Sequence, residues 1–287
     1  MTEQKKQVAV VGAGTMGKQI AVLYASRGYT AVLWDYKNRS DSTIKELKRL
    51  ATLNSKLGLI SKDKINDILE IIYYTVDLAD IEKADLVIEA VIEDRSIKKN
   101  ILLEIENVIH ESTILGSNTS TLSITELSSS LQKPARFLGI HFFNPVLSSN
   151  LVEVVKGIHS SAEVVESVHH VLSHLDKAPV ILKDTPGFVV NRLLFLMINE
   201  AISMLSEGVA APEVIDKCMR DGAGHKMGPL ELADFIGLDI CLRSIENLYT
   251  ETSDSKYRPV PLLKEYVQSG KLGRKSGVGF YAYSKKG

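Results

Sequence analysis

Apolar positions recur with two different periods along the first two thirds of the chain. Apolar runs of strand length occupy residues 7–11 and 30–34, and between them Ile20, Leu23 and Tyr24 have the spacing of one helical face. Further strands are predicted at residues 71–76, 86–90, 113–117, 137–142, 152–155 and 180–182, with helical patterns between most of them. Alternating β and α units predict an α/β fold whose mainly parallel sheet is covered by helices on both faces.

The pattern changes at residues 184–187, an Asp-Thr-Pro-Gly sequence, after which helical periods dominate. Residues 188–205 are apolar almost all round, which predicts a buried helix. Residues 211–213, Ala-Pro-Glu, predict another helix start with proline in the first turn. We therefore predict an α/β domain of residues 1–185 and a smaller all-α domain of residues 186–287.

Composition argues against nucleic acid and membrane partners. Of the 287 residues 45% are apolar and 24% charged, and the net charge of −1 produces no global field. No signal-peptide pattern occurs, and no apolar run approaches the roughly 20 residues of a membrane helix, so a cytoplasmic location is expected. Cys218 and Cys241 lie in apolar helical patterns and suggest core packing in a reducing compartment.

A glycine-rich turn follows the first predicted strand. Residues 12–17, Gly-Ala-Gly-Thr-Met-Gly, fit G-x-G-x-x-G between a strand and a helix. Gly12 makes the tight turn, Gly14 lets the backbone approach a pyrophosphate, and Gly17 lets the helix pack on the strand. The N–H groups of the helix start, at Thr15 and Met16, suit phosphates. The pattern predicts a Rossmann-type dinucleotide site; a glycine turn before an unrelated helix is the alternative.

Asp35 ends the second predicted strand, 18 residues after Gly17. A carboxylate there accepts hydrogen bonds from the adenosine ribose and repels a 2′-phosphate, which favours NAD over NADP. Lys37 and Arg39 are close in sequence and weaken this preference.

Polar residues interrupt apolar segments at four further places. Residues 117–120, Ser-Asn-Thr-Ser, and His141 lie at strand ends, where an open α/β sheet forms its ligand crevice. Glu153 alternates with apolar strand residues, and Asn191 lies in the apolar helix. Each also fits a simpler role as a turn or cap, a structural histidine, a solvent-facing glutamate, or an amide bonded to backbone.

Together these segments resemble the L-3-hydroxyacyl-CoA dehydrogenase family, especially monofunctional 3-hydroxybutyryl-CoA dehydrogenases, over nearly the whole chain. The order and spacing of Ser120, His141, Glu153 and Asn191 match the family pattern. Matching segments also occur at residues 227–231, 237–239 and 273–281.

The resemblance implies oxidation of the 3-hydroxyl of a short acyl-coenzyme A ester, with NAD taking the hydride. His141 is then the general base, a role worth about 10²–10⁴-fold, and Glu153 bonds its other ring nitrogen. Ser120 and Asn191 bind substrate oxygens as the other catalytic-site residues. No metal is required, because positioned donors stabilise the alkoxide-like charge.

The same resemblance implies that Glu93, Lys98, Ser120, Asn144 and Lys275 line the NAD site. On sequence alone, Glu93 and Lys98 equally fit a solvated pair at a helix start. The implied partners are an acyl-CoA substrate and a second copy of the chain in a homodimer.

The chain departs from the family pattern in three places. Residues 147–150, Leu-Ser-Ser-Asn, stand where the family usually has Pro-Val-Met-Lys, so a positive charge near the active site is missing. Lys226 stands where the family often has proline. Residues 40–64, expected to contact coenzyme A, match loosely. However, residues 37–64 carry eight Lys/Arg against three Asp/Glu, which suits an anionic ligand or a solvated helical face.

Three functions stay open at this point. The first is 3-hydroxyacyl-CoA oxidation, and the second is a related dehydrogenase for a dicarboxylic 3-hydroxyacyl-CoA or a sugar acid. The third is a non-catalytic NAD-binding protein. A metal site at His169, His170 and His174 lacks a nearby acid or cysteine at ligand spacing, so no metal is expected.

Overall fold

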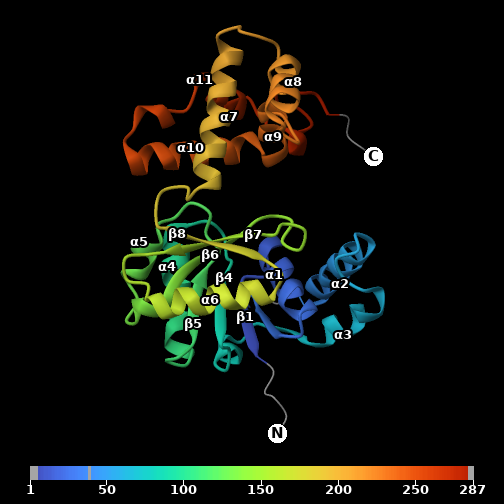
Figure 1. The fold of residues 1–287 in the computed structure, drawn as a ribbon, viewed down its shortest axis with the longest axis vertical. Coiled ribbons are helices and arrows are strands. Elements are labelled where there is room, and N and C mark those ends of the chain that lie inside the picture. The colour runs from blue at the N-terminus through green and yellow to red at the C-terminus, as the bar shows by residue number, and fades with distance from the viewer. Residues whose placement is uncertain (1–5, 38–39, 284–287) are drawn as a thin grey trace. The chain divides into compact units, whose positions relative to one another are not determined.

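The protein folds into two compact units that divide between Thr185 and Pro186 (Figure 1). The computed structural model describes residues 6–37 and 40–283. The first unit is α/β and the second is helical, so the predicted fold class is confirmed. None of the helices in these residues is both long and apolar enough to span a membrane.

One sheet organises the first unit. Among the described residues it has eight strands in the order β3-β2-β1-β4-β5-β6-β7-β8. The strands are β1 (Gln7–Val11), β2 (Thr30–Trp34), β3 (Ile72–Thr75), β4 (Leu86–Glu89), β5 (Ile114–Ser117), β6 (Phe137–Phe142), β7 (Leu151–Lys156) and β8 (Ala178–Lys183). Every neighbouring pair is parallel except β6 and β7, so the prediction of a mainly parallel sheet is confirmed.

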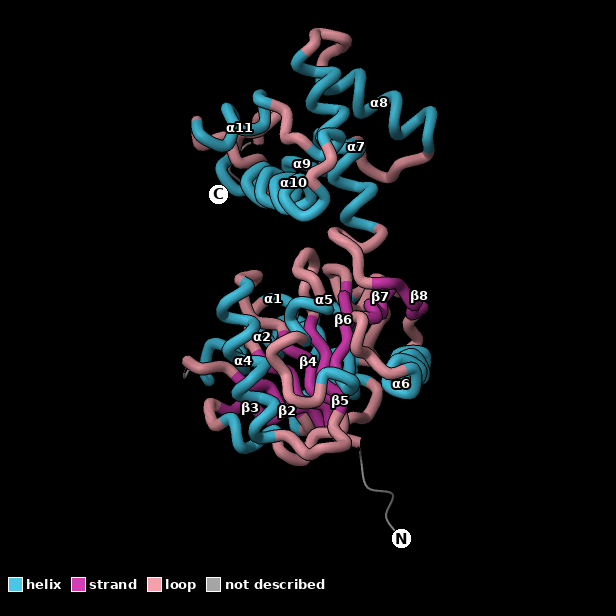
Figure 2. The backbone as a smooth tube through the Cα atoms, turned by 90° about the vertical axis from the view of Figure 1, so that its left-hand side faces the viewer, coloured by secondary structure: helices cyan, strands magenta, loops and turns pink. Residues whose placement is uncertain are grey.

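Helices cover both faces of this sheet. α1 (Thr15–Ser26) and α6 (Ala162–His174) contribute to one core, in which Ile20 and Val168 are fully buried. Figure 2 shows α4 (Arg95–Val108) and α6 on opposite sides of the strands. The central strands are apolar at nearly every position because both of their faces are covered. The remaining helices of the unit are α2 (Ser40–Lys56), α3 (Ile65–Glu70) and α5 (Ile124–Ser128).

The chain reverses direction between β6 and β7. These two strands pair antiparallel, and their register sets His141 directly opposite Glu153. The parallel strands β1, β2, β4, β5 and β6 all end at one edge of the sheet, so β7 starts at that edge. Residues from distant parts of the sequence therefore meet along this carboxyl edge.

The described part of the second unit has five α-helices around its own core. They are α7 (Val190–Ser206), α8 (Pro212–Ala223), α9 (Pro229–Ile236), α10 (Leu238–Thr252) and α11 (Pro261–Gln268). The core includes Ile198, Leu230 and Ile245. The prediction of an all-round buried helix over residues 188–205 is wrong, because α7 packs one side against its neighbours and leaves Leu193 64% exposed.

The two cysteines lie in different surroundings. Cys241 is buried in the core of the second unit, as predicted, and burial raises the pKa of its thiol to about 12. Cys218 is exposed on α8, so core packing is the wrong prediction for this residue. The difference arises because α8 is amphipathic and buries only a narrow side, including Ile215 and Asp216.

Two buried carboxylates hold the loops of the second unit. Asp216 accepts the backbone N–H of Leu230 at the start of α9, at 2.8 Å. Asp234 accepts the backbone N–H groups of Phe280 and Tyr281 at 3.0 and 2.9 Å. These contacts give a structural role to segments 227–231 and 273–281, which carry part of the family resemblance.

Gly17 is predicted to be required for the stability of the first unit. A Cβ at this position would lie 1.8 Å from the carbonyl oxygen of Gly12, which is a backbone atom. We expect Gly17→Ala to lower the free energy of unfolding by about 3 kcal/mol, measured by urea titration. The control is Gly14→Ala, where a Cβ meets no atom within 4 Å and the loss should stay below about 1 kcal/mol. Equal stability of the two variants would contradict this packing argument.

Candidate active site

The glycine-rich turn joins β1 to α1 at the carboxyl edge of the sheet. Gly12 has a φ of +113°, which glycine adopts without strain, and its N–H donates to the carbonyl of Trp34 at 2.8 Å. α1 begins at Thr15, and the N-cap residue Gly14 supplies no capping side chain. The first turn of α1 therefore presents its backbone N–H groups without a protein cap, as an anion site requires.

A cavity of about 240 Å³ adjoins this turn. It is lined by Gly12, Ala13, Gly14, Trp34, Asp35, Tyr36, Ala90, Val91 and Ile92. A side chain at Gly14 would meet no protein atom within 4 Å, so the backbone there faces open space. A bare glycine backbone, an uncapped helix start and a carboxylate fit the pyrophosphate and adenosine of NAD.

Asp35 lies half-buried directly after β2. Its carboxylate accepts the backbone N–H of Lys37 at 3.2 Å. The ammonium of Lys37 lies 5.1 Å from the centre of the Tyr36 ring. Arg39, the other cation near Asp35 in sequence, lies outside the described residues. Asp35 thus supplies the carboxylate that lines the cavity.

His141 and Glu153 form a buried pair. The Nδ1 atom of His141 lies 2.7 Å from Oε2 of Glu153, and the residues are 6% and 1% exposed. This contact follows from the β6–β7 register, which places the two side chains opposite each other on one face. A carboxylate on Nδ1 fixes the proton there and makes Nε2 the acceptor. The geometry suits a general base that is oriented by an acid.

Glu93 accepts hydrogen bonds from the residues that follow β5. Its Oε1 accepts hydrogen bonds from the backbone N–H and hydroxyl of Ser120 and from those of Thr121, and from the hydroxyl of Thr119. Burial acts to raise the pKa of Glu93, but the Lys98 ammonium and these hydrogen bonds outweigh it and hold the pKa below its ordinary value. Glu93 and Ser120, both predicted site residues, are therefore in direct contact.

Glu89, which was not among the residues predicted from the sequence, binds two members of this region, Lys98 and Ser117. It is fully buried at the end of β4, and its Oε1 lies 2.7 Å from the Lys98 ammonium. Its Oε2 accepts the hydroxyl of Ser117 at 2.6 Å. Lys98 is 1% exposed, which excludes a solvated pair at the helix start. The signal that could have found Glu89 is an acid at the last position of an apolar strand.

Two amide side chains make hydrogen bonds at the end of β6 and in the loop that follows it. Asn118 accepts the backbone N–H of Phe142 at 2.9 Å. Asn144, a predicted NAD residue, accepts from Gln19 of α1 at 2.9 Å. Gln19 is 5% exposed and was also missed, because one polar residue in an amphipathic helix gives no distinctive signal.

The basic residues of α2 lie on its solvent side. Lys45, Lys48, Arg49 and Lys56 are exposed, whereas Leu47 and Ala51 face the core. Lys18 of α1 pairs with Glu46 of α2. Both interpretations of this segment, a solvated face and a surface for an anion, stay compatible with the structure.

Asn191 and Lys275 belong to the second unit. Asn191 lies half-buried in the first turn of α7, and Lys275 pairs with Asp239 at the start of α10. Their predicted approach to His141 and to NAD stays a prediction. The buried amide of α7 is instead Asn199, which bonds Arg258 and Val260 backbone atoms at 2.9 and 3.1 Å.

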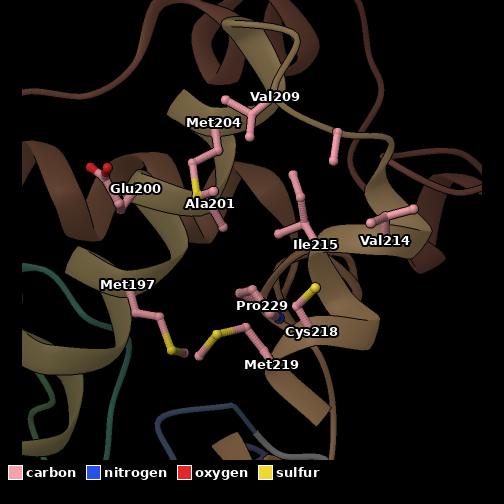
Figure 3. Close-up of a pocket in the computed structure, with 11 residues that line it drawn as sticks. Met197, Glu200, Ala201, Met204, Val209, Val214, Ile215, Cys218, Met219 and Pro229 are labelled. Carbon is pink, nitrogen blue, oxygen red and sulfur yellow. The ribbon is translucent and has the colours of Figure 1, made fainter. Parts of the chain in front are cut away.

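An apolar cavity of about 300 Å³ lies between α7 and α8. Its lining is Met197, Glu200, Ala201, Met204, Val209, Ala210, Val214, Ile215, Cys218, Met219 and Pro229. Figure 3 shows Met197 and Met219 pointing toward each other, while the Glu200 carboxylate points away. This lining suits an apolar occupant rather than proton or hydride chemistry.

The histidines of α6 contact groups of their own helix. His170 is exposed and pairs with Glu166 at 3.1 Å, and His174 Nδ1 contacts the carbonyl of His170 at 2.8 Å. The described residues hold no cluster of three or more His, Cys, Asp or Glu suited to a metal ion.

Known proteins match this chain along nearly its whole length. Residues 7–185 match the model of the 3-hydroxyacyl-CoA dehydrogenase NAD binding domain, and residues 187–283 match that family's C-terminal domain. This chain belongs to the 3-hydroxyacyl-CoA dehydrogenase family. It is an NAD-dependent dehydrogenase, and the glycine turn and its cavity are the features that fit the cofactor.

Individual relatives in the 3-hydroxyacyl-CoA dehydrogenase family are similar over nearly their full length. The probable 3-hydroxybutyryl-CoA dehydrogenase of Bacillus subtilis is 43% identical, covering 98% of both chains. The 3-hydroxybutyryl-CoA dehydrogenase of Clostridioides difficile is 43% identical, covering 97% of this chain and 100% of its own. The crystal structure of (S)-3-hydroxybutyryl-CoA dehydrogenase from Ralstonia eutropha has a TM-score of 0.94 and 41% identity, covering 98% of this chain and 100% of its own.

The Glu89–Lys98 pair makes a prediction about stability. Lys98→Met leaves the Glu89 carboxylate buried without its cation, which should cost about 3–5 kcal/mol in the free energy of unfolding. Removing both charges in Glu89→Gln/Lys98→Met should restore most of that loss. Chemical denaturation of the three proteins measures this. A double variant no more stable than Lys98→Met would show that the charges are not the cause.

Proposed function

We propose that this dehydrogenase interconverts a short-chain L-3-hydroxyacyl-CoA and the matching 3-oxoacyl-CoA, with 3-hydroxybutyryl-CoA and acetoacetyl-CoA as the first pair to test. The observation that carries the proposal is the buried contact of His141 with Glu153 at the edge where the glycine turn also lies. The names of the similar proteins support the substrate class.

In the oxidising direction, His141 takes the proton of the 3-hydroxyl at Nε2, because Nδ1 is engaged by Glu153. The Glu153 carboxylate stabilises the imidazolium that forms. The glycine turn and Asp35 would hold NAD, which would supply the acceptor for the hydride on carbon 3 of the substrate. Loss of one proton and one hydride converts the alcohol to a ketone, and in reverse His141 donates the proton.

The remaining predicted residues are proposed to bind and orient the substrate and NAD. Ser120 and Asn191 are proposed to hold the substrate oxygens, so that the reacting carbon faces the cofactor. Glu93, Lys98, Asn144 and Lys275 are proposed to complete the NAD site with residues 12–17 and Asp35. Support for Glu93 and Lys98 is their ion pair, together with the contact of buried Lys98 with Glu89 of β4 and that of Glu93 with Ser120 after β5.

The cofactor and substrate can be tested in one assay. Purified protein is mixed with acetoacetyl-CoA and either NADH or NADPH, and loss of nicotinamide absorbance is followed. We expect turnover with NADH at least about tenfold faster than with NADPH, because Asp35 repels a 2′-phosphate. Binding of NADH without turnover would point to another acyl chain, to a dicarboxylic substrate or to a non-catalytic role.

The role of His141 is tested by substitution. His141→Ala should lower kcat by about 10²–10⁴-fold, because the general base is lost. The affinity for NADH, measured by fluorescence titration, should change little. The matched control is His170→Ala, an exposed histidine on α6 that should keep full activity. Comparable turnover in His141→Ala would refute the mechanism.

We further propose that the chain forms a homodimer through α7 and α8. Support comes from the apolar cavity between these helices and from the exposure of three apolar side chains that line it, Met204, Val209 and Val214. A monomer would leave this apolar patch in water, which a two-fold interface avoids.

Sedimentation velocity tests the dimer. The wild-type protein should have twice the mass of the chain, and Val214→Glu should shift it toward the monomer by placing a charge in the interface. The control is Ile158→Glu, which changes another exposed apolar residue, 76% exposed, in the first unit. A dimer that survives Val214→Glu would place the interface elsewhere.

A further inference from the structure

The segment between β6 and β7, residues 143–150, connects the strand of His141 to the strand of Glu153. It carries Asn144 and the residues that depart from the family pattern. Its own side chains include no titratable group. Any charged group that contacts this segment must therefore belong to another part of the chain.

Lys177 is one charged group that contacts the segment. It precedes β8 and is 7% exposed. Its ammonium donates to the carbonyl oxygens of Val146, Leu147 and Ser149 at 2.6, 3.2 and 2.8 Å. An ammonium has three N–H groups, so all of its donors are used on this one segment.

Gln19 holds the same segment from the side of α1. Its Oε1 accepts the backbone N–H of Val146 at 2.9 Å. Its Nε2 donates to the side chain of Asn144, also at 2.9 Å. Val146 is therefore fixed at both its N–H and its carbonyl, by two buried side chains from distant parts of the sequence.

The charge of Lys177 has few compensating partners. The charged groups near it are Arg27, at the end of α1, and Asp176, which pair with each other at 2.9 Å. Burial, and to a lesser extent Arg27, lower the pKa of Lys177 to about 8. The ammonium therefore loses its third N–H within the pH range of an ordinary assay.

We propose that Lys177 is a positioning residue. Through its bonds to segment 143–150, and together with Gln19, it holds the ends of β6 and β7 in the places that keep His141 in contact with Glu153. The inference rests on the proposed function. It assigns to a lysine outside the segment the task of ordering a loop that carries no charge of its own. When Lys177 is deprotonated, its amine has two N–H groups and a lone pair. The lone pair repels the carbonyl oxygen that it faces, so the binding of Lys177 to segment 143–150 weakens.

Lys177→Met tests this, because methionine keeps most of the side-chain volume and removes the charge. We expect kcat with acetoacetyl-CoA and NADH to fall about tenfold at pH 7, as a displaced acid–base pair would cause, with little change in KM. The control is Lys183→Met, an exposed lysine at the far end of β8, which should behave as wild type.

The pH profile separates positioning from simple packing. The ratio of wild-type to Lys177→Met activity should be large at pH 7 and decline through about pH 8, because the wild-type lysine itself becomes neutral. A ratio that stays constant from pH 6.5 to 9.5 would overturn the proposal, and so would equal activity. Far-ultraviolet circular dichroism verifies that both proteins are folded.

A readout that does not need turnover completes the test. Amide hydrogen exchange in residues 143–150 should be faster in Lys177→Met than in wild type and Lys183→Met, with exchange elsewhere unchanged. Unchanged exchange in the segment would overturn the positioning role. If wild type fails to reduce acetoacetyl-CoA, the proposed substrate is wrong, while hydrogen exchange still decides whether Lys177 orders the segment.

Discussion

The antiparallel pairing of β6 with β7 is the constraint on which the site depends. In the described sheet, six of the seven neighbouring strand pairs are parallel, and that arrangement alone brings loop ends to one edge. The single reversal returns the chain at the same edge and sets Glu153 across from His141. Because opposite residues of an antiparallel pair share a face, backbone hydrogen bonding fixes an acid–base contact of 2.7 Å.

Buried charge around that edge is organised in two separate ways. The buried Glu89 and Lys98 form a compensated network with the partly exposed Glu93, and removing Lys98 leaves the Glu89 carboxylate buried without its cation. Lys177 has carbonyl oxygens rather than a carboxylate as its partners, so its charge is held less firmly. The first network suits permanent support, whereas the contacts of Lys177 with segment 143–150 are the ones that we propose weaken as pH rises.

Sequence periodicity predicted the eight strands of the described sheet within two residues, because short apolar runs bounded by polar turns are typical of β-strands. The prediction that α7 is buried all round was wrong, because an apolar pattern does not show which side of a helix packs against other helices. The glycine turn was predictable since each glycine has a steric reason visible in the motif. Gln19 and Glu89 were not, because single polar residues in helix and strand gain meaning only from partners 125 and 28 positions away.

The sequence by itself determined the fold class and the family, and it predicted which residues form the candidate site. Those follow from local patterns and from the spacing of Ser120, His141, Glu153 and Asn191 along the chain. Only the tertiary structure decided that Glu153 reaches Nδ1 of His141, and that Lys98 is buried rather than solvated. The physical reason is that burial and hydrogen-bond partnership depend on which elements pack together, and sheet order brings together residues that no local pattern connects.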